Sequence, residues 1–141
     1  MRLAGLIAAA RAEAANCLLF DNGDTLQGAP LADAVVAGDG LATRGHPMIA
    51  AMNALGYDAA TLGNHDFDFG LPVLRRALAD AGFPVVLSNA APAEGAPFAR
   101  ARVLLKRTLR DTRGRSHPLG IGVIGLAPPQ TAQWGRGVLR D

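Results

Sequence analysis

The sequence has one cysteine, little net charge and no long apolar run. A single cysteine excludes an internal disulfide, and Cys17 is expected to be a small core residue because it lies in the apolar segment 17–20. A membrane-spanning helix needs about 20 consecutive apolar residues, so no membrane association is predicted.

The formal net charge of the 141 residues is +2, which gives no indication of a nucleic-acid polymer as a partner. Half of the residues are hydrophobic, a content too high for a disordered chain. A chain of this length is expected to form one globular domain that buries roughly 70% of its unfolded surface.

The first 17 residues resemble a secretion signal only superficially, because Arg11 and Glu13 interrupt the apolar region. Apolar residues recur here at helical spacing, and we predict an amphipathic surface helix over residues 2–14. The residues of this stripe are Leu3, Leu6, Ile7, Ala10 and Ala14.

Short apolar segments then alternate with helical patterns. Strands are predicted at 17–21, 57–62 and 84–89, and a glycine-rich connection through Gly38, Gly40 and Gly45 follows the first strand. Helices are predicted from Pro47 to Gly56 and from Pro72 to Gly82, because proline favours a first helical turn and glycine follows a last one. Helices between short strands are typical of βαβ units with a parallel sheet.

The pattern changes after residue 97. Residues 100–110 and 117–128 flank the turn "DTRGRS" and predict a hairpin of two longer strands. The arginines from Arg107 to Arg115 are expected to be solvated on this hairpin. The predicted fold class is α/β: a mixed sheet with flanking helices that turns antiparallel toward one edge, with a C-terminal antiparallel hairpin.

Two loops at predicted strand ends carry the residues best suited to chemistry. The first holds Asp21, Asn22, Asp24 and Gln27, and the second holds Asn64, His65, Asp66 and Asp68. The carboxyl ends of strands are where open α/β sheets collect their sites. Carboxylate, amide and imidazole groups bind divalent metals, although aspartate, asparagine and glycine are also common in turns.

The first loop, "FDNGDT", suggests a dehalogenase-type phosphatase. That class needs two aspartates at i and i+2 followed by Gly-Thr, whereas Asp21 and Asp24 are three positions apart and Gly23 precedes Asp24. This alternative is therefore disfavoured.

The sequence Gly-Asn-His-Asp at 63–66, after a strand, and the earlier pair Gly23-Asp24 resemble two motifs of the calcineurin-like metallophosphoesterases. The blocks "DNGDTLQGAPLAD", "HPMIAAMNALGYDAATLGNHDFDFGLPVLRRAL", "FPVVLSNA" and "IGVIGLAPPQTAQW" resemble, in order, the bacterial 5'-nucleotidase and 2',3'-cyclic-nucleotide 2'-phosphodiesterase/3'-nucleotidase family. They are most similar to the cyclic phosphodiesterase branch, while Asp68 is typical of the 5'-nucleotidase branch. The resemblance implies a partial metallophosphoesterase sandwich, export to the periplasm and a nucleotide substrate.

The resemblance also implies a site with two divalent metal ions. Asp24 would bridge both ions, Asn64 would bind one of them, and His65 would face the leaving group with Asp68 as its partner. Chemically, two cations neutralise phosphate oxygens and lower the pKa of bound water. An imidazole titrates near neutrality and protonates a departing alkoxide, and a carboxylate beside it favours its charged form. No substrate-binding residue is identified.

Other polar residues are given structural roles. Asp66 is expected to hydrogen-bond its loop, Asp21 and Asn22 to shape the first turn, and His46 and His117 to be structural. Trp134 is expected in the core. Gln27 stays open, and Asn89 either touches the site or satisfies backbone groups.

Parts of the family pattern are missing. The Asp-x-His motif of a first strand, the later His motifs and the base-binding domain have no counterpart, so residues 1–141 are expected to be a fragment of a catalytic domain. We expect little or no hydrolysis and weak metal binding by this chain alone. A truncated, non-catalytic domain that binds a nucleotide or a partner is the alternative, and self-association through an open sheet edge is also considered.

Overall fold

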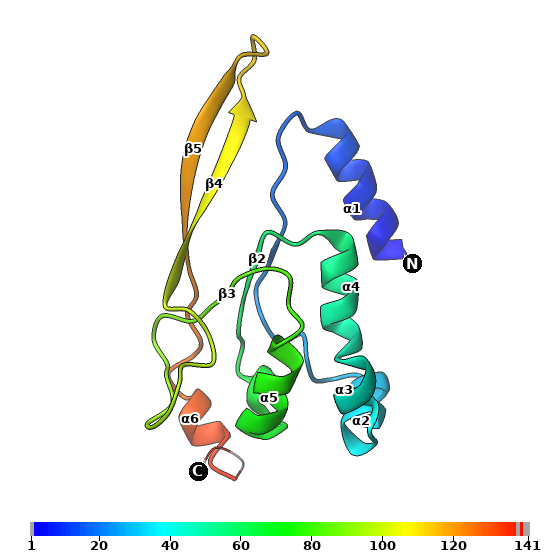
Figure 1. Ribbon diagram of the computed structural model, residues 1–141, viewed down its shortest axis with the longest axis vertical. Coiled ribbons are helices and arrows are strands. Elements are labelled where there is room, and N and C mark those ends of the chain that lie inside the picture. The colour runs from blue at the N-terminus through cyan, green and yellow to red at the C-terminus, as the bar shows by residue number, and fades with distance from the viewer. Residues whose placement is uncertain (1, 138, 140–141) are drawn as a thin grey trace.

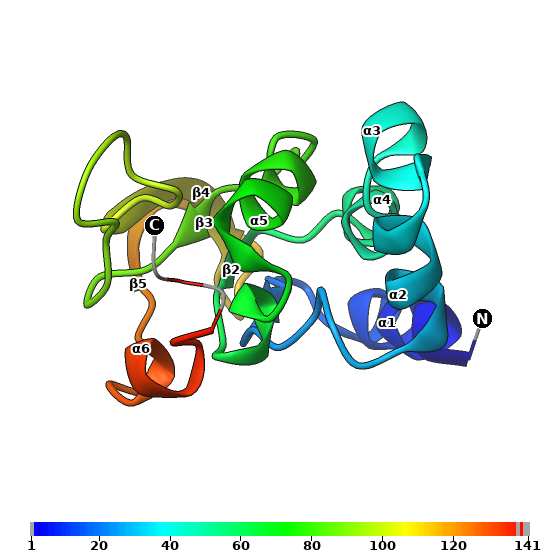
Figure 2. The ribbon, with the colours of Figure 1, turned by 90° about the horizontal axis from the view of Figure 1, so that it is seen from below.

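The computed structural model of the protein describes residues 2–137 and 139, and it confirms the α/β class (Figure 1). A small parallel sheet lies at the centre, helices cover it, and a long hairpin projects beyond it (Figures 1 and 2). The helices are α1 (Arg2–Glu13), α2 (Pro30–Ala37), α3 (Gly40–Arg44), α4 (Pro47–Leu55), η1 (His65–Phe67), α5 (Gly70–Leu78) and α6 (Thr131–Trp134). None of the helices in this described part is long and apolar enough to span a membrane.

The central sheet has the order β1-β2-β3, and both pairings are parallel as predicted. Its strands, β1 (Phe20–Asp21), β2 (Ala59–Thr61) and β3 (Val85–Val86), are shorter than expected. At the start of β1, the Asp58 side chain takes the place of a backbone partner, because its Oδ2 accepts a hydrogen bond from Leu19 N at 2.9 Å. Regular pairing therefore begins only at residue 20.

The hydrophobic core lies between this sheet and helices α4 and α5. Ile49 and Met52 of α4 and Leu74 and Ala77 of α5 are buried there. The remaining core residues come from the short helices α3 and η1, from β2 and from the loops: Leu26, Leu41, Ala60, Leu62, Phe67, Phe83, Leu87 and Ala127. Since Leu26, Leu62 and Phe67 belong to the two polar loops, the same core that stabilises the fold also anchors these loops.

The hairpin pairs β4 (Arg102–Arg110) with β5 (Ser116–Ile124) in an antiparallel register of nine residues each. It forms a separate two-stranded sheet, and the predicted C-terminal antiparallel hairpin is confirmed. The hairpin meets β3 at its base, where Val86 bridges Arg100 and Ser88 N donates to the carbonyl of Gly125 at 2.7 Å. This junction is too short to count as a further strand.

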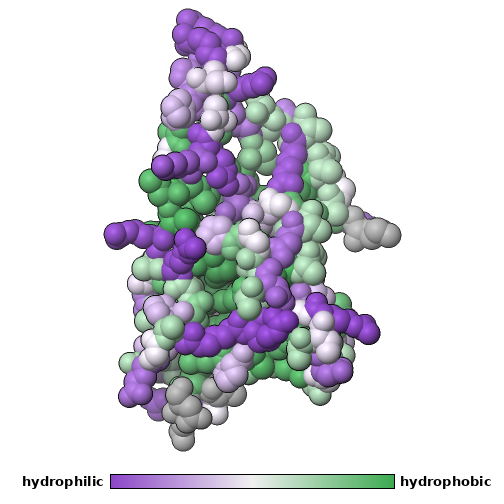
Figure 3. Space-filling model, in the orientation of Figure 1, coloured by the Kyte–Doolittle hydropathy of each residue, from purple (hydrophilic) through white to green (hydrophobic). Residues whose placement is uncertain are grey.

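The hairpin is also tied to the first sheet by an ion pair. Arg107 donates to the Asp58 carboxylate at 2.6 Å, and the backbone of Arg110 pairs with the Asn16 side chain. The other arginines of this segment are solvated, as predicted, and polar side chains cover the hairpin tip (Figure 3).

Helices α2 and α3 correct the prediction of a glycine-rich connection. Pro30 begins α2, Gly38 follows its end, and Gly40 begins α3 after a single intervening residue. The glycines therefore separate two short helices rather than forming an irregular segment. Helix α5 likewise starts at Gly70 and ends at Leu78, earlier than the predicted stop at Gly82.

Several apolar residues lie at the surface, and three of them bear on the sequence predictions. Helix α1 is the surface helix that the sequence predicts, but Leu3 on its apolar stripe remains 60% exposed, and Arg11 attaches the helix to the carbonyls of Leu55 and Gly56. Cys17 is exposed because it precedes the first strand, and the prediction of a core cysteine is wrong. Trp134 is 63% exposed at the end of a four-residue helix, so its core assignment is also wrong.

Candidate active site

The parallel strands bring the two polar loops together at one edge of the sheet. Gly23 (φ 89°) and Gly63 lie against each other where the loops leave β1 and β2. A Cβ on Gly23 would overlap Gly63 N and lie 2.7 Å from the Leu62 carbonyl carbon. The loops therefore approach as closely as only glycine permits.

Asp24 follows this contact in a left-handed conformation with φ 58°, among the described residues the only non-glycine with positive φ. Such a conformation costs about 1 kcal/mol or more for a residue with a Cβ and requires support from its surroundings. Its side chain is exposed, and Oδ1 accepts a hydrogen bond from His65 N at 2.9 Å. The structure thus brings the predicted metal ligand of the first loop to the histidine of the second.

The buried Asp66 side chain stabilises both loops through hydrogen bonds to their backbones. Its side chain is 3% exposed and accepts four backbone N–H groups, from Asp24, Thr25, Leu26 and Gly63, at 2.8–2.9 Å. Burial raises the pKa of this carboxyl, and the four hydrogen bonds oppose that rise. The prediction that Asp66 hydrogen-bonds its loop is confirmed.

Asp21 shapes the first turn, as expected, because its Oδ2 accepts from Gly23 N at 3.0 Å and from the Thr25 hydroxyl at 2.8 Å. It thereby orders the segment between the strand and Asp24. Asn22 is exposed in the same turn.

His65 and Asp68 form a pair on the η1 turn. His65 Nδ1 donates to Asp68 Oδ2 at 2.8 Å, and both side chains are largely exposed. The hydrogen bond and the charge of Asp68 raise the pKa of His65 above its ordinary value, with smaller contributions from Asp24 and Asp66. This bond leaves Nε2 of the ring directed away from Asp68.

We expect the His65 ring of the metal-free chain to titrate above the ordinary histidine pKa of about 6.5. Asp68→Asn removes the charge and weakens the hydrogen bond, so the pKa should fall toward that value. An NMR titration of the wild type and of Asp68→Asn measures the His65 pKa in both. An unchanged His65 pKa in the variant would show that Asp68 does not set it.

Asp24 and Asn64 are the two residues that the sequence predicts as metal ligands. Asp24 Oδ2 has no hydrogen-bond donor among residues 2–137 and 139, and Asn64 lies one residue from the amide that binds Asp24 Oδ1. A carboxylate and an amide oxygen on exposed, adjacent loops suit hard and borderline divalent cations. The chemistry of these two residues fits a divalent metal ion. Two ligands are too few to complete a site, and the described residues contain no group of three histidine, cysteine, aspartate or glutamate side chains that could hold a metal.

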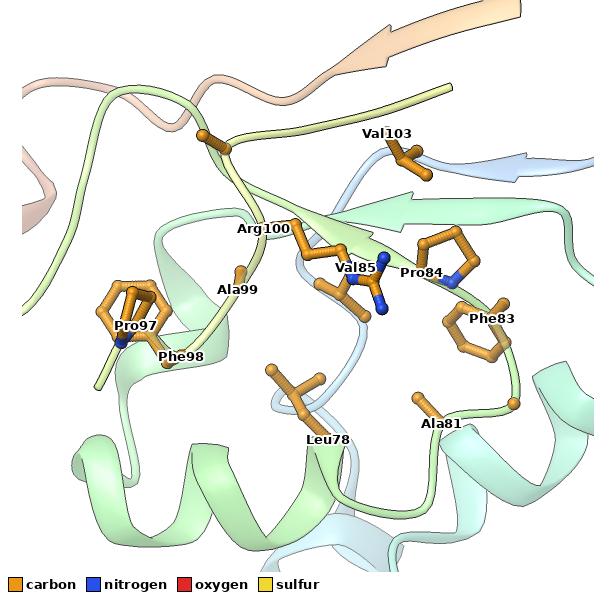
Figure 4. Close-up of a pocket in the computed structure, with 12 residues that line it drawn as sticks. Leu78, Ala81, Phe83, Pro84, Val85, Pro97, Phe98, Ala99, Arg100 and Val103 are labelled. Carbon is orange, nitrogen blue, oxygen red and sulfur yellow. The ribbon is translucent and has the colours of Figure 1, made fainter. Parts of the chain in front are cut away.

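A hollow of about 340 Å³ opens beside Asp24. Its lining includes the polar residues Asp21, Thr25 and Gln27 as well as Met48 and Tyr57. Gln27, which the sequence leaves open, is therefore a neighbour of the candidate site. A larger hollow of about 840 Å³ lies elsewhere, between α5, β3 and the segment 97–103, with Leu78, Phe83 and Arg100 around it (Figure 4).

His46 and Asn89 are structural, as the sequence favours for the histidine. His46 is 1% exposed, donates from Nε2 to the Leu26 carbonyl at 3.0 Å and accepts the Met48 amide at the start of α4. Asn89 exchanges two hydrogen bonds with the backbone of Ala127. These contacts decide the open question for Asn89 in favour of backbone satisfaction.

Burial lowers the pKa of His46, while the Leu26 carbonyl and Asp66 oppose that shift. Its folded pKa then lies below its unfolded value of about 6.5, so its contribution to stability is present above that pH and is lost as the pH falls through it. We expect the free energy of unfolding to decrease from pH 7 to pH 5 more steeply in the wild type than in His46→Asn. Equal slopes in urea titrations would contradict this.

No protein-family model matches the chain. Two relatives, from Yersinia enterocolitica and Haemophilus influenzae, are named 2',3'-cyclic-nucleotide 2'-phosphodiesterase/3'-nucleotidase. The first is 42% identical over 95% of this chain, and the second is 41% identical over 99%. The calcineurin-like phosphoesterase YfkN from Bacillus subtilis, a solved structure, is 40% identical and superposes over 98% of this chain with a TM-score of 0.89. The chain belongs to the calcineurin-like metallophosphoesterase family.

The match covers almost all of this chain but a small share of its relatives. The chain spans 21% of the length of the two curated relatives and 42% of the solved YfkN chain. The family assignment therefore applies to the part of the catalytic fold that carries the Gly23-Asp24 and Gly63–Asp66 motifs. The activity, substrates and partners of a whole protein do not follow from it directly.

Two features of the site escaped the sequence reasoning. The left-handed conformation of Asp24 and the contact between Gly23 and Gly63 depend on residues about 40 positions apart. Each loop contains a glycine at the critical position, and this was the available signal, but glycine alone does not reveal what approaches it.

Proposed function

We propose that these residues form part of a metal-dependent phosphoester hydrolase that acts on nucleotides. The observation that carries the proposal is the contact between the two loops: Asp24 Oδ1 accepts the His65 amide, and His65 in turn binds Asp68. This contact supports the proposal because it puts the proposed metal ligand, Asp24, next to the proposed acid–base group, His65, on exposed loops. The names of the relatives support a nucleotide substrate.

Each residue has a definite task in this proposal. Asp24 and Asn64 would hold divalent metal ions, which when bound neutralise the phosphate and lower the pKa of a water molecule. His65 keeps its Nδ1–H on Asp68 and therefore presents Nε2 to the substrate. Because Asp68 raises the pKa of His65, the ring stays protonated closer to neutral pH and can give the Nε2 proton to the leaving oxygen.

Among nucleotides, we propose 2',3'-cyclic nucleotides and 3'-monophosphates as substrates, after the names of the relatives at 41–42% identity. A 5'-nucleotidase activity is the second candidate, because Asp68 forms with His65 the dyad that is typical of that branch. The two candidates share the metal site and differ in which phosphoester reaches it.

The test uses the complete gene product that carries these residues, assayed with Mn²⁺ on a 2',3'-cyclic nucleotide, a 3'-monophosphate and a 5'-monophosphate. We expect metal-dependent hydrolysis of the first two, abolished by a chelator. Hydrolysis of the 5'-monophosphate alone would favour the second candidate, and no hydrolysis of any of the three would contradict the proposal.

A non-catalytic role of the isolated chain is supported by the small number of metal ligands within its described residues. We expect little or no turnover of bis-p-nitrophenyl phosphate by this chain with Mn²⁺. Efficient turnover that His65→Ala abolishes would contradict that expectation.

In the gene, an upstream Asp-x-His motif and a downstream His-x-His motif would favour the enzyme, whereas a reading frame that lacks both would favour a non-catalytic domain. Export is proposed as well, and a leader peptide in the complete gene product would support it.

A further inference from the structure

One buried carboxylate joins the two loops of the candidate site. Asp66 Oδ1 accepts the amides of Thr25 and Leu26, and Oδ2 accepts those of Asp24 and Gly63. The first three amides belong to the loop after β1, and the last belongs to the loop after β2. Asp66 is thus the only described side chain that accepts backbone hydrogen bonds from both loops.

We infer that Asp66 is a positioning residue that fixes the left-handed conformation of Asp24 and aims its carboxylate at the amide of His65. Asp66 itself touches neither metal nor substrate in this scheme. That Asp66 positions Asp24 follows from the hydrogen bonds alone. The consequence for metal binding rests on the proposed function.

The geometry explains why a carboxylate is needed at position 66. Four N–H donors converge on two oxygens, two on each, and hydrogen bonds from N–H groups to an ionised carboxylate are among the stronger ones in proteins. An asparagine of the same shape has only one acceptor oxygen. Whichever way it is turned, two of the four amides then face an NH₂ group and lose their partner.

Asp24 needs this support because of its backbone. A residue with a Cβ is strained at φ 58° and relaxes to a negative φ unless other contacts hold it. The close contact of Gly23 with Gly63 restricts movement of the loop backbone next to Asp24. Asp66 fixes the backbone amides of residues 24, 25 and 26 through hydrogen bonds. Because the backbone conformation of residue 24 sets where its Cβ points, these bonds also orient the Asp24 side chain. His65 N reports on that direction, because it donates to Asp24 Oδ1 and not to the Asp66 side chain.

The experiment compares the wild-type chain with Asp66→Asn by amide NMR and hydrogen exchange. Exchange is expected to accelerate by roughly tenfold to a hundredfold for the two amides that lose their acceptor, either Thr25 and Leu26 or Asp24 and Gly63, the effect of losing a charge-assisted hydrogen bond. Exchange of the His65 amide is expected to accelerate as well, because its hydrogen bond to Asp24 Oδ1 is weakened when Asp24 loses its support. Asp111→Asn is the matched control, because Asp111 also accepts backbone amides, from Arg113 and Arg115, on the distant hairpin turn.

A folded Asp66→Asn chain in which these five amides behave as in the wild type would overturn the inference. If the variant does not fold, the wild type still decides: protection of the Asp24 and Thr25 amides, in an otherwise exposed loop, supports the inference, and unprotected exchange overturns it. Added Mn²⁺ separates the two claims. Absence of line broadening near Asp24 in the wild type would count against the proposed metal site, whereas the amide exchange rates alone decide the role of Asp66.

Discussion

Gly23→Ala is expected to destabilise the fold by about 3 kcal/mol or more, which is a large part of the 5–15 kcal/mol typical of a domain. A left-handed backbone costs an alanine about 1–2 kcal/mol. The new methyl group would in addition overlap the backbone of Gly63 and lie 2.7 Å from the Leu62 carbonyl carbon. Because the three atoms nearest to this methyl group belong to the backbone of Leu62 and Gly63, no side-chain rotation relieves the overlap, and the two loops must separate.

Gly95→Ala is the matched control. Gly95 has a similar φ of 82°, but a Cβ there would meet no atom within 4 Å. Urea unfolding followed by circular dichroism should therefore show a loss of about 1–2 kcal/mol for Gly95→Ala and a clearly larger one for Gly23→Ala. Equal losses for the two variants would show that the loops do not depend on the close contact at Gly23.

His65→Ala in the complete gene product is expected to lower kcat for nucleotide hydrolysis by about 10²–10⁴, the usual contribution of a positioned general acid. KM should change much less, because the ring is assigned to the departing oxygen and not to binding of the nucleotide. Steady-state kinetics with saturating Mn²⁺ measure both parameters.

His117→Ala is the control for this variant. His117 is also exposed and also lies within hydrogen-bond distance of an aspartate, Asp111, but it sits on the hairpin far from the polar loops. Its replacement should leave kcat within about twofold, as is usual for surface sites away from the chemistry. A loss of kcat in His117→Ala equal to that in His65→Ala would remove the special role assigned to His65.

The sequence predicted the placement of the two polar loops better than it predicted the packing. Asp24, Asn64, His65 and Asp68 follow predicted parallel strands, and the structure places them on adjacent loops because parallel strands end at the same edge. The His65–Asp68 contact was foreseeable as well, since residues three positions apart meet on one helical turn.

Properties that depend on distant parts of the chain were not foreseeable. Trp134 and Cys17 are apolar residue types, but only the fold decides whether another segment covers them. Among the described residues, no segment buries either side chain. Helices α2 and α3 were missed because Gly38 and Gly40 suggest an irregular segment. The number of amides that Asp66 accepts depends on a loop 40 residues earlier, which no local pattern reveals.

Addition of Mn²⁺ to the isotope-labelled chain, followed through amide line broadening, tests the central claim most directly, because a paramagnetic ion reports even weak binding at its site. The predicted result is broadening centred on Asp24, Asn64 and His65 that Asp24→Asn removes and Asp111→Asn leaves intact. Asparagine tolerates the left-handed conformation of residue 24, so this variant changes the charge with little change in the backbone. Broadening that persists in Asp24→Asn, or that centres on the hairpin turn, would contradict a metal site formed by Asp24 and Asn64.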